Sequence, residues 1–218
     1  MRLRVGVIVA ALIGVAVDLH AQAPRVVEDW SDRPAAGRLP ATWSFYGREP
    51  KLKFPPAVVI DEGRRALWLK TEGYSVRLAR SIDVDVRHER ILHWQWKAVT
   101  LPEQGDIRGE ISDQVARIVL FFPPRYRPRA LGYVWDTRAP VDTETHQKQM
   151  MLERWLVVVR SGPADLGNWV SETRYIERDY IRLFGTPPPP LMGIGIESHS
   201  EDAPHASEVF VGPIMLGR

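Results

Sequence analysis

The sequence predicts an all-β fold, a jelly-roll-like β-sandwich with one short helix near the C-terminus. Short segments rich in β-branched and aromatic residues recur along the chain, and Gly, Pro and Asp separate them. Helical spacing of apolar residues is convincing only in residues 176–184. Because a parallel α/β sheet needs a crossover helix between most of its strands, this scarcity of helices favours a sandwich.

The first element, residues 1–23, is predicted to be a signal peptide. Arg2 and Arg4 precede a mostly apolar run at residues 5–17, and the AQA sequence at residues 21–23 has the small-x-small pattern of a cleavage site. A retained anchor is the alternative, but the apolar run is too short to span a bilayer. We therefore expect a periplasmic or secreted protein with no membrane insertion after signal removal.

Residues 24–218 are predicted to form a single β-sandwich domain, because a chain of this length buries enough surface to fold without disulfide or metal staples. The sequence contains no cysteine, which excludes a disulfide framework and a lipid-anchored lipoprotein. The formal net charge of +2 falls to +1 when the signal peptide, with two arginines and one aspartate, is removed. That small excess of positive charge does not predict nucleic-acid binding.

Ten segments are expected to be strands. Leu92, Trp94 and Trp96 alternate with polar residues, which indicates a strand with one buried and one exposed face. Residues 118–122 form an unbroken apolar run, which is typical of a strand covered on both faces. The predicted strands are residues 58–61, 66–71, 74–84, 90–101, 114–122, 131–136, 154–160, 168–174, 192–197 and 208–216.

The one predicted helix, residues 176–184, follows directly after a predicted strand. Its apolar residues recur at helical spacing, and Gly185 stands where a C-cap belongs. We expect this helix to pack across a sheet edge. Residues 139–149 have no convincing period and are expected to form a long loop between strands.

Established catalytic motifs are missing from the sequence. It has no G-x-S-x-G elbow, no H-E-x-x-H, no phosphate-binding glycine loop and no cysteine nucleophile. No catalytic residue, cofactor or metal ligand is therefore assigned. Residues 197–205, ESHSEDAPH, offer carboxylates and imidazoles but lack a recognised ligand spacing, so a solvated loop is preferred to a metal site.

Several segments together carry a resemblance to a known family. The segments LHWQWKA, ISDQVARIVLFF, LGYVWDT, LVVVRSGPADLGNWVSETRYIERDYIRLFG and LMGIGIESHSED occur in this order. In this respect the chain resembles the bacterial domain-of-unknown-function family 3047 over residues 29–216. The resemblance implies export and a jelly-roll sandwich of the carbohydrate-binding kind, and it implies no activity.

Within these segments, six residues are predicted to line one ligand-binding face. They fall in pairs, and alternation along a strand puts the two members of each pair on the same side. Aromatic rings and planar charged groups together suit a sugar. The alternative is buried ion pairs, of Asp113 with Arg117 and of Glu172 with another arginine. The predicted ligand-binding residues are Asp113, Arg117, Tyr133, Trp135, Glu172 and Arg174.

The preferred function is that of a non-catalytic exported protein that binds a glycan or another small polar ligand on a concave sheet face. The alternative is a polysaccharide hydrolase or lyase with a Glu/Asp acid–base pair, and a third possibility is scaffolding in the cell envelope. A closed polar cleft with two facing carboxyls would favour the enzyme. An open aromatic platform would favour the binding protein, and a flat surface would favour the scaffold.

Overall fold

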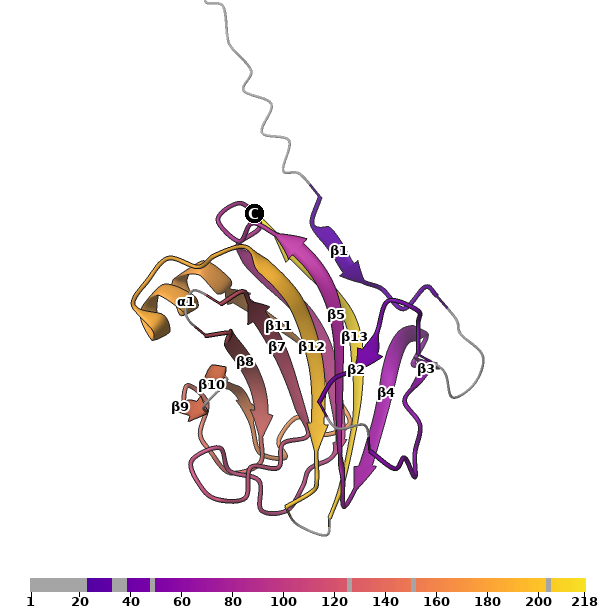
Figure 1. The fold of residues 1–218 in the computed structure, drawn as a ribbon. Coiled ribbons are helices and arrows are strands. Elements are labelled where there is room, and N and C mark those ends of the chain that lie inside the picture. The colour runs from indigo at the N-terminus through magenta and orange to yellow at the C-terminus, as the bar shows by residue number, and fades with distance from the viewer. Residues whose placement is uncertain (1–22, 33–38, 48–49, 125–126, 150–151, 203–204) are drawn as a thin grey trace, which may run out of the picture.

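The computed structural model describes residues 23–32, 39–47, 50–124, 127–149, 152–202 and 205–218. Within these ranges, thirteen strands and one helix form a sandwich of two sheets (Figure 1). The predicted jelly-roll-like β-sandwich with one short helix near the C-terminus is confirmed. The predicted signal peptide, residues 1–23, lies outside the described residues except for Ala23.

The first sheet has six strands in the part of the chain that the structure describes, and it is antiparallel throughout. Five strands follow the order β11-β6-β13-β4-β3, and β1 pairs with β13. The strands of this six-stranded sheet are β11 (Val170–Tyr175), β6 (Ile91–Thr100), β13 (Ala206–Gly217), β4 (Arg64–Glu72), β3 (Ala57–Asp61) and β1 (Arg25–Glu28).

The second sheet has seven described strands in the order β2-β5-β12-β7-β8-β10-β9, which run from right to left in Figure 1. β10 pairs with β8 in parallel, and the other neighbours pair antiparallel. The strands of this seven-stranded sheet are β2 (Ser44–Phe45), β5 (Ser75–Val84), β12 (Leu191–His199), β7 (Ala116–Phe122), β8 (Arg129–Asp136), β10 (Leu152–Ser161) and β9 (Glu144–Gln149).

Aromatic side chains from both sheets meet in the core. Trp94 of β6 stacks on Tyr133 of β8 with ring centroids 5.6 Å apart, and Trp96 lies 5.7 Å from Trp135. All four side chains are at most 1% exposed. The predicted alternation in β6 is therefore confirmed, because every second residue faces the core.

The predicted helix is confirmed as α1 (Ile176–Phe184). It ends at Gly185, whose φ of 70° is the left-handed conformation of a glycine C-cap. The helix covers one end of the sandwich, because Tyr180 packs on Phe122 with ring centroids 4.6 Å apart and Asp179 accepts a hydrogen bond from the Tyr133 hydroxyl at 3.0 Å. No described helix is long and apolar enough to cross a membrane.

All ten predicted strands are present, with ends that differ by a few residues. The prediction that residues 139–149 form a loop holds for residues 139–143 but was wrong for Glu144–Gln149, which form the edge strand β9. Its sequence is entirely polar, and backbone pairing with β10 holds it in the sheet. β1 and the two-residue β2 were also not predicted.

Candidate functional site

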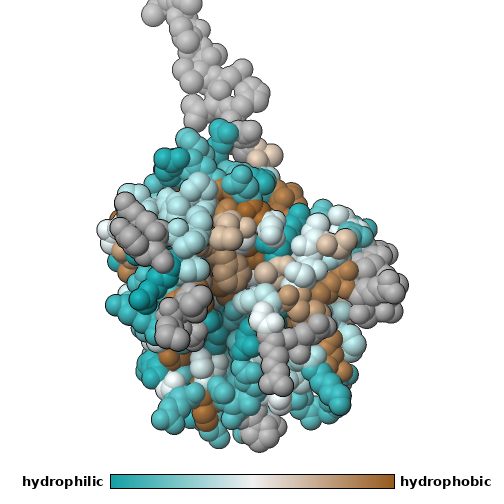
Figure 2. All heavy atoms as spheres, in the orientation of Figure 1, coloured by the Kyte–Doolittle hydropathy of each residue, from teal (hydrophilic) through white to brown (hydrophobic). Residues whose placement is uncertain are grey.

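The site lies on the outer face of the seven-stranded sheet, the face that points away from the six-stranded sheet. Arg77 of β5, Glu197 of β12 and Arg117 of β7 are direct neighbours across three adjacent strands. Direct neighbours project from the same face of a sheet, so these side chains gather on one surface. In Figure 2, mostly hydrophilic residues cover the lower part of the molecule, where β5 begins and β12 ends in Figure 1.

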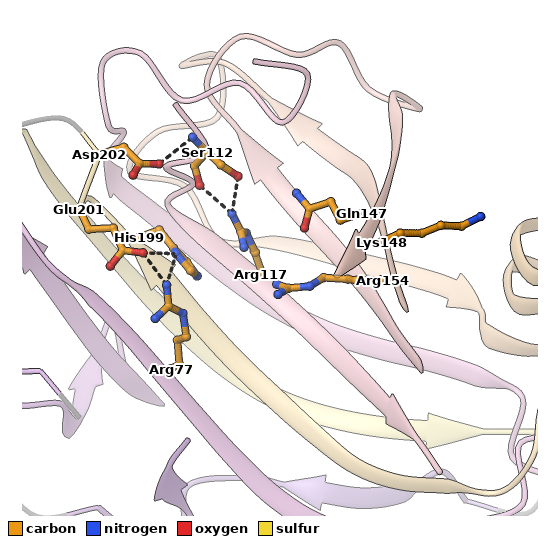
Figure 3. Close-up of a pocket in the computed structure, with 9 residues that line it drawn as sticks. All are labelled: Arg77, Ser112, Arg117, Gln147, Lys148, Arg154, His199, Glu201 and Asp202. Carbon is orange, nitrogen blue, oxygen red and sulfur yellow. Dashed lines mark hydrogen bonds and ion pairs between the residues drawn. The ribbon is translucent and has the colours of Figure 1, made fainter. Parts of the chain in front are cut away.

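This surface holds a pocket of about 560 Å³. Its floor comes from β12 and β7, one wall from β5 and the segments beside it, and the other wall from β9 and β10. Figure 3 shows the guanidinium of Arg117 between His199 and Arg154. The pocket is lined by Arg77, Ser112, Arg117, Gln147, Lys148, Arg154, His199, Glu201 and Asp202.

A buried carboxylate, Glu197, lies beneath the pocket with 1% of its surface exposed. It accepts hydrogen bonds from Arg117 Nη1 at 3.1 Å, from His199 Nε2 at 2.7 Å and from the Tyr46 hydroxyl. Burial alone would raise the pKa of Glu197, but the hydrogen bond from His199 and the charge of Arg117 hold that pKa well below its usual value. Glu197 is therefore ionised at neutral pH.

His199 is neutral at the same pH. Burial, together with the charge of Arg117, lowers the pKa of His199 to about 4, although Glu197 acts in the opposite direction. Since a carboxylate only accepts, we assign the ring proton to Nε2, which leaves Nδ1 to accept from Ser75 Oγ at 3.1 Å. With both ring nitrogens engaged, His199 belongs to a fixed polar floor.

On the wall beside β5, the polar side chains bond to one another and to the floor of the pocket. Arg77 pairs with Glu201 at 2.5 Å, and the backbone N–H of Ser112 donates to Asp202 at 3.0 Å. Arg117 Nη2 donates to the carbonyl oxygen of Ser112 at 2.7 Å. These groups satisfy one another, so this wall has few free donors.

The wall formed by β9 and β10 differs in this respect. Among the described residues, no hydrogen bond is found for the side chains of Arg154, Gln147 and Lys148, and none is drawn to them in Figure 3. The nearest carboxylate to Arg154 is Glu197, whose oxygen lies 3.8 Å from Nη1. The Nε of Arg154 is buried and has no acceptor. This wall therefore presents unused donors to the pocket.

A second pocket, of about 470 Å³, lies farther along the same strands. Ser81, Gly193 and Phe121 line it, and Gly193 is the direct neighbour of the other two across the sheet. The Phe121 ring lies against Gly195, where an added Cβ would be only 2.9 Å from the ring. Phe121 also meets Tyr46 edge to face, with ring centroids 5.3 Å apart. Two aromatic rings thus stand between the pockets.

Of the six predicted ligand-binding residues, only Arg117 lines the larger pocket. Asp113 is fully buried and accepts hydrogen bonds from the backbone N–H groups of Glu201 and Asp202, so it fixes the segment that carries them. β7 begins only at Ala116, and the expected alternation therefore does not extend back to Asp113. The sequence alone does not show where β7 begins.

The other four predicted residues lie elsewhere. Tyr133 and Trp135 point into the core, which corrects their placement on a ligand-binding face. Glu172 and Arg174 belong to β11 in the six-stranded sheet. There Glu172 accepts from Arg160 at 2.9 Å, as the ion-pair alternative expected, and Arg174 pairs with Asp179.

Sequence reasoning missed most of the pocket. Arg77, Arg154 and His199 come from three strands that are far apart in the chain, and only the strand order brings them together. The segment ESHSED, interpreted above as a solvated loop, supplies Glu197 and His199 from the end of β12. Among the residues that the structure describes, no three His, Asp or Glu side chains converge in a way that could hold a metal ion.

Comparison with known proteins identifies a family and distant fold relatives. Residues 42–215 match the family model described as "Protein of unknown function (DUF3047)". No curated protein matches the sequence.

Three solved structures with a similar fold are carbohydrate-related proteins. One is a carbohydrate-binding module, CBM28, specific for non-crystalline cellulose, with a TM-score of 0.45, 14% identity, and coverage of 91% of this chain and 97% of that one. Another is the xyloglucanase domain of NopAA from Sinorhizobium fredii, with a TM-score of 0.44, 9% identity, and coverage of 80% and 92%. The third is endoglucanase 3 of family GH12 from Trichoderma harzianum, with a TM-score of 0.42, 10% identity, and coverage of 74% and 82%.

Proposed function

The chain belongs to DUF3047, a family whose function is unknown. We therefore propose a function from the geometry of the two pockets on the seven-stranded sheet. The proposed function is non-catalytic binding of a glycan along the outer face of the seven-stranded sheet. The ligand would lie in the cleft, by which we mean the two pockets together with the Phe121 and Tyr46 rings between them.

The observation that carries this proposal is the arrangement of two pockets along the same strands. Arg117 and Phe121 are four residues apart on β7, which corresponds to roughly 13 Å at ~3.3 Å per residue. One pocket offers guanidinium and amide donors, and the other offers an aromatic ring beside small polar residues. An oligosaccharide matches this cleft, because its hydroxyls take planar donors and the C–H faces of its rings pack on aromatic side chains.

Binding is favoured over hydrolysis because the carboxylates Glu197 and Glu201 are already paired with other side chains of the site. A glycosidase uses two carboxyl groups that flank the scissile bond, and one of them donates a proton. Glu197 is buried with a pKa well below its usual value, which does not suit a proton donor. Glu201, on the wall of the pocket, is paired with Arg77. Both carboxylates thus serve the hydrogen-bond network of the site.

Glycan binding is tested by calorimetric titration of residues 24–218 with neutral and acidic oligosaccharides. We expect binding of at least one oligosaccharide, and Phe121→Ala should weaken it by about two- to tenfold, as expected for an aromatic contact of about 0.5–1.5 kcal/mol. Phe210→Ala is the matched control, because Phe210 lies on β13 in the other sheet and packs near Trp169. Absence of binding to every oligosaccharide would contradict the proposal.

We also propose that the protein is exported, on the basis of the charged start, the apolar run and the AQA site. In a Gram-negative host, we expect the protein in the periplasmic fraction, with its mass reduced by that of about the first 23 residues. Mass spectrometry of fractionated cells measures this directly. Full-length protein in the cytosol would rule out the signal peptide.

A further inference from the structure

We infer that the end of the cleft beside Arg154 is a subsite for an anionic sugar unit, one that carries a carboxylate or a sulfate. This inference rests on the proposed glycan binding and adds the chemical class of the ligand. Arg154 and Gln147 would bind the anionic group directly, and Arg117 would add positive charge from the floor.

The balance of charges in the larger pocket supports an anionic ligand. Four lining side chains are cationic, whereas Glu201 and Asp202 are the two lining carboxylates. Each of these carboxylates is already bonded on the β5 side of the pocket, Glu201 to Arg77 and Asp202 to a backbone N–H. The positive charge on the β9–β10 side therefore has no matching carboxylate on its own wall.

Glu197 compensates the charge of Arg154 only in part, through an ion pair at 3.8 Å. Its two oxygens already accept from Arg117, His199 and Tyr46, and its distance of 3.8 Å from Arg154 is too long for a hydrogen bond. One ionised carboxylate thus stands beside two guanidinium groups. The surplus positive charge lies at Arg154, on the pocket side of the network.

The donors of Arg154 and Gln147 are positioned together. The two residues are direct partners across the β9–β10 pair, and in Figure 3 both side chains point toward Arg117. A guanidinium beside an amide offers several N–H donors in a fixed arrangement, which suits the paired oxygens of a carboxylate or sulfate. No described residue accepts from them, so these donors are available to a ligand.

Partial burial makes this site selective for charge. The side chain of Arg154 is only 17% exposed, so water solvates its charge poorly. A sugar hydroxyl would satisfy a donor but would leave the positive charge uncompensated. An anionic group accepts the hydrogen bond and also compensates the positive charge, so the bond is charge-assisted. A neutral glycan should therefore bind less tightly than an acidic one of the same length.

The test compares three oligosaccharides of matched length in calorimetric titrations of residues 24–218: a cello-oligosaccharide, an oligogalacturonate and a heparin-derived sulfated oligosaccharide. We expect one of the two anionic ligands to bind at least about tenfold more tightly than the neutral one, since a charge-assisted bond corresponds to about that factor. Which anionic ligand binds distinguishes carboxylate from sulfate. Arg154→Gln should abolish most of this preference.

Two further variants separate the subsite from folding and from net charge. Gln147→Ala changes a side chain on an edge strand and should also weaken the acidic ligand, by about two- to tenfold. Arg178→Gln removes one positive charge from an exposed position on α1 and should leave affinity unchanged. Thermal melts confirm that each variant is folded.

Each remaining outcome has a distinct meaning. Equal binding of neutral and acidic ligands would overturn the anionic subsite while glycan binding stands. An equal effect of Arg178→Gln and Arg154→Gln would also overturn it, because net charge would then explain the preference. If none of the three ligands binds and the broader panel of oligosaccharides also fails, the proposed function and this inference fail together.

Discussion

Replacement of Trp135 by alanine is expected to lower the free energy of unfolding by about 3–5 kcal/mol, the usual cost of truncating a large aromatic side chain in a packed interior. Trp135 is fully buried, packs against Trp96 and donates from Nε1 to the carbonyl oxygen of Gly162 at 3.2 Å. Alanine would leave a cavity and an unpaired carbonyl. Urea unfolding followed by fluorescence measures the loss.

Tyr175→Ala is the control for this change. Tyr175 is also aromatic, but it is 47% exposed at the end of β11, and its truncation should cost less than about 1 kcal/mol. A loss for Trp135→Ala no larger than that for Tyr175→Ala would contradict the placement of Trp135 in the core.

Glu197→Gln is expected to destabilise the fold by about 3–5 kcal/mol, because removal of one partner leaves a buried charge without compensation. Arg117 is 3% exposed, and Glu197 is the carboxylate that pairs with it. Glutamine keeps the size of the side chain, so the effect reports on charge more than on packing. The free energy of unfolding at neutral pH is the measured quantity.

Two other variants test this explanation. Glu201→Gln removes a carboxylate of the same pocket, but its ion pair with Arg77 is partly exposed and should contribute less than about 1 kcal/mol. Adding Arg117→Gln to Glu197→Gln should recover part of the lost stability, because the double variant no longer buries the charge of Arg117 without its carboxylate. If the double variant loses the sum of the two single effects, the two residues do not act as a pair.

The sequence was sufficient to predict ten of the thirteen described strands and the helix, because their signals are local. The residues of α1 recur at helical spacing and end at a glycine, and the tryptophans of β6 alternate with polar residues. β9 was missed for the opposite reason: ETHQKQ has no apolar alternation, and only its partner β10 makes it a strand.

The site could not be predicted in the same way, because faces depend on register. Arg117 and Tyr133 were expected on one surface, yet Arg117 pairs opposite Val134 and Tyr133 pairs opposite Ile118. A shift of one residue moves a side chain to the other face of the sheet. Alternation shows which residues of one strand share a face. It does not show which residues of the neighbouring strand lie on that same face, because that depends on the register between the two strands.

The order of the strands also has a consequence for when the chain can fold. β12 is inserted between β5 and β7, and β13 between β4 and β6, so the last two described strands are inner strands, one in each sheet. Neither sheet can close until residues 191–218 have been synthesised, and pairing strands that are so distant in sequence is slow. A nascent chain that has reached only residue 190 therefore lacks one inner strand of each sheet, so β5 and β7, and likewise β4 and β6, have no partner between them.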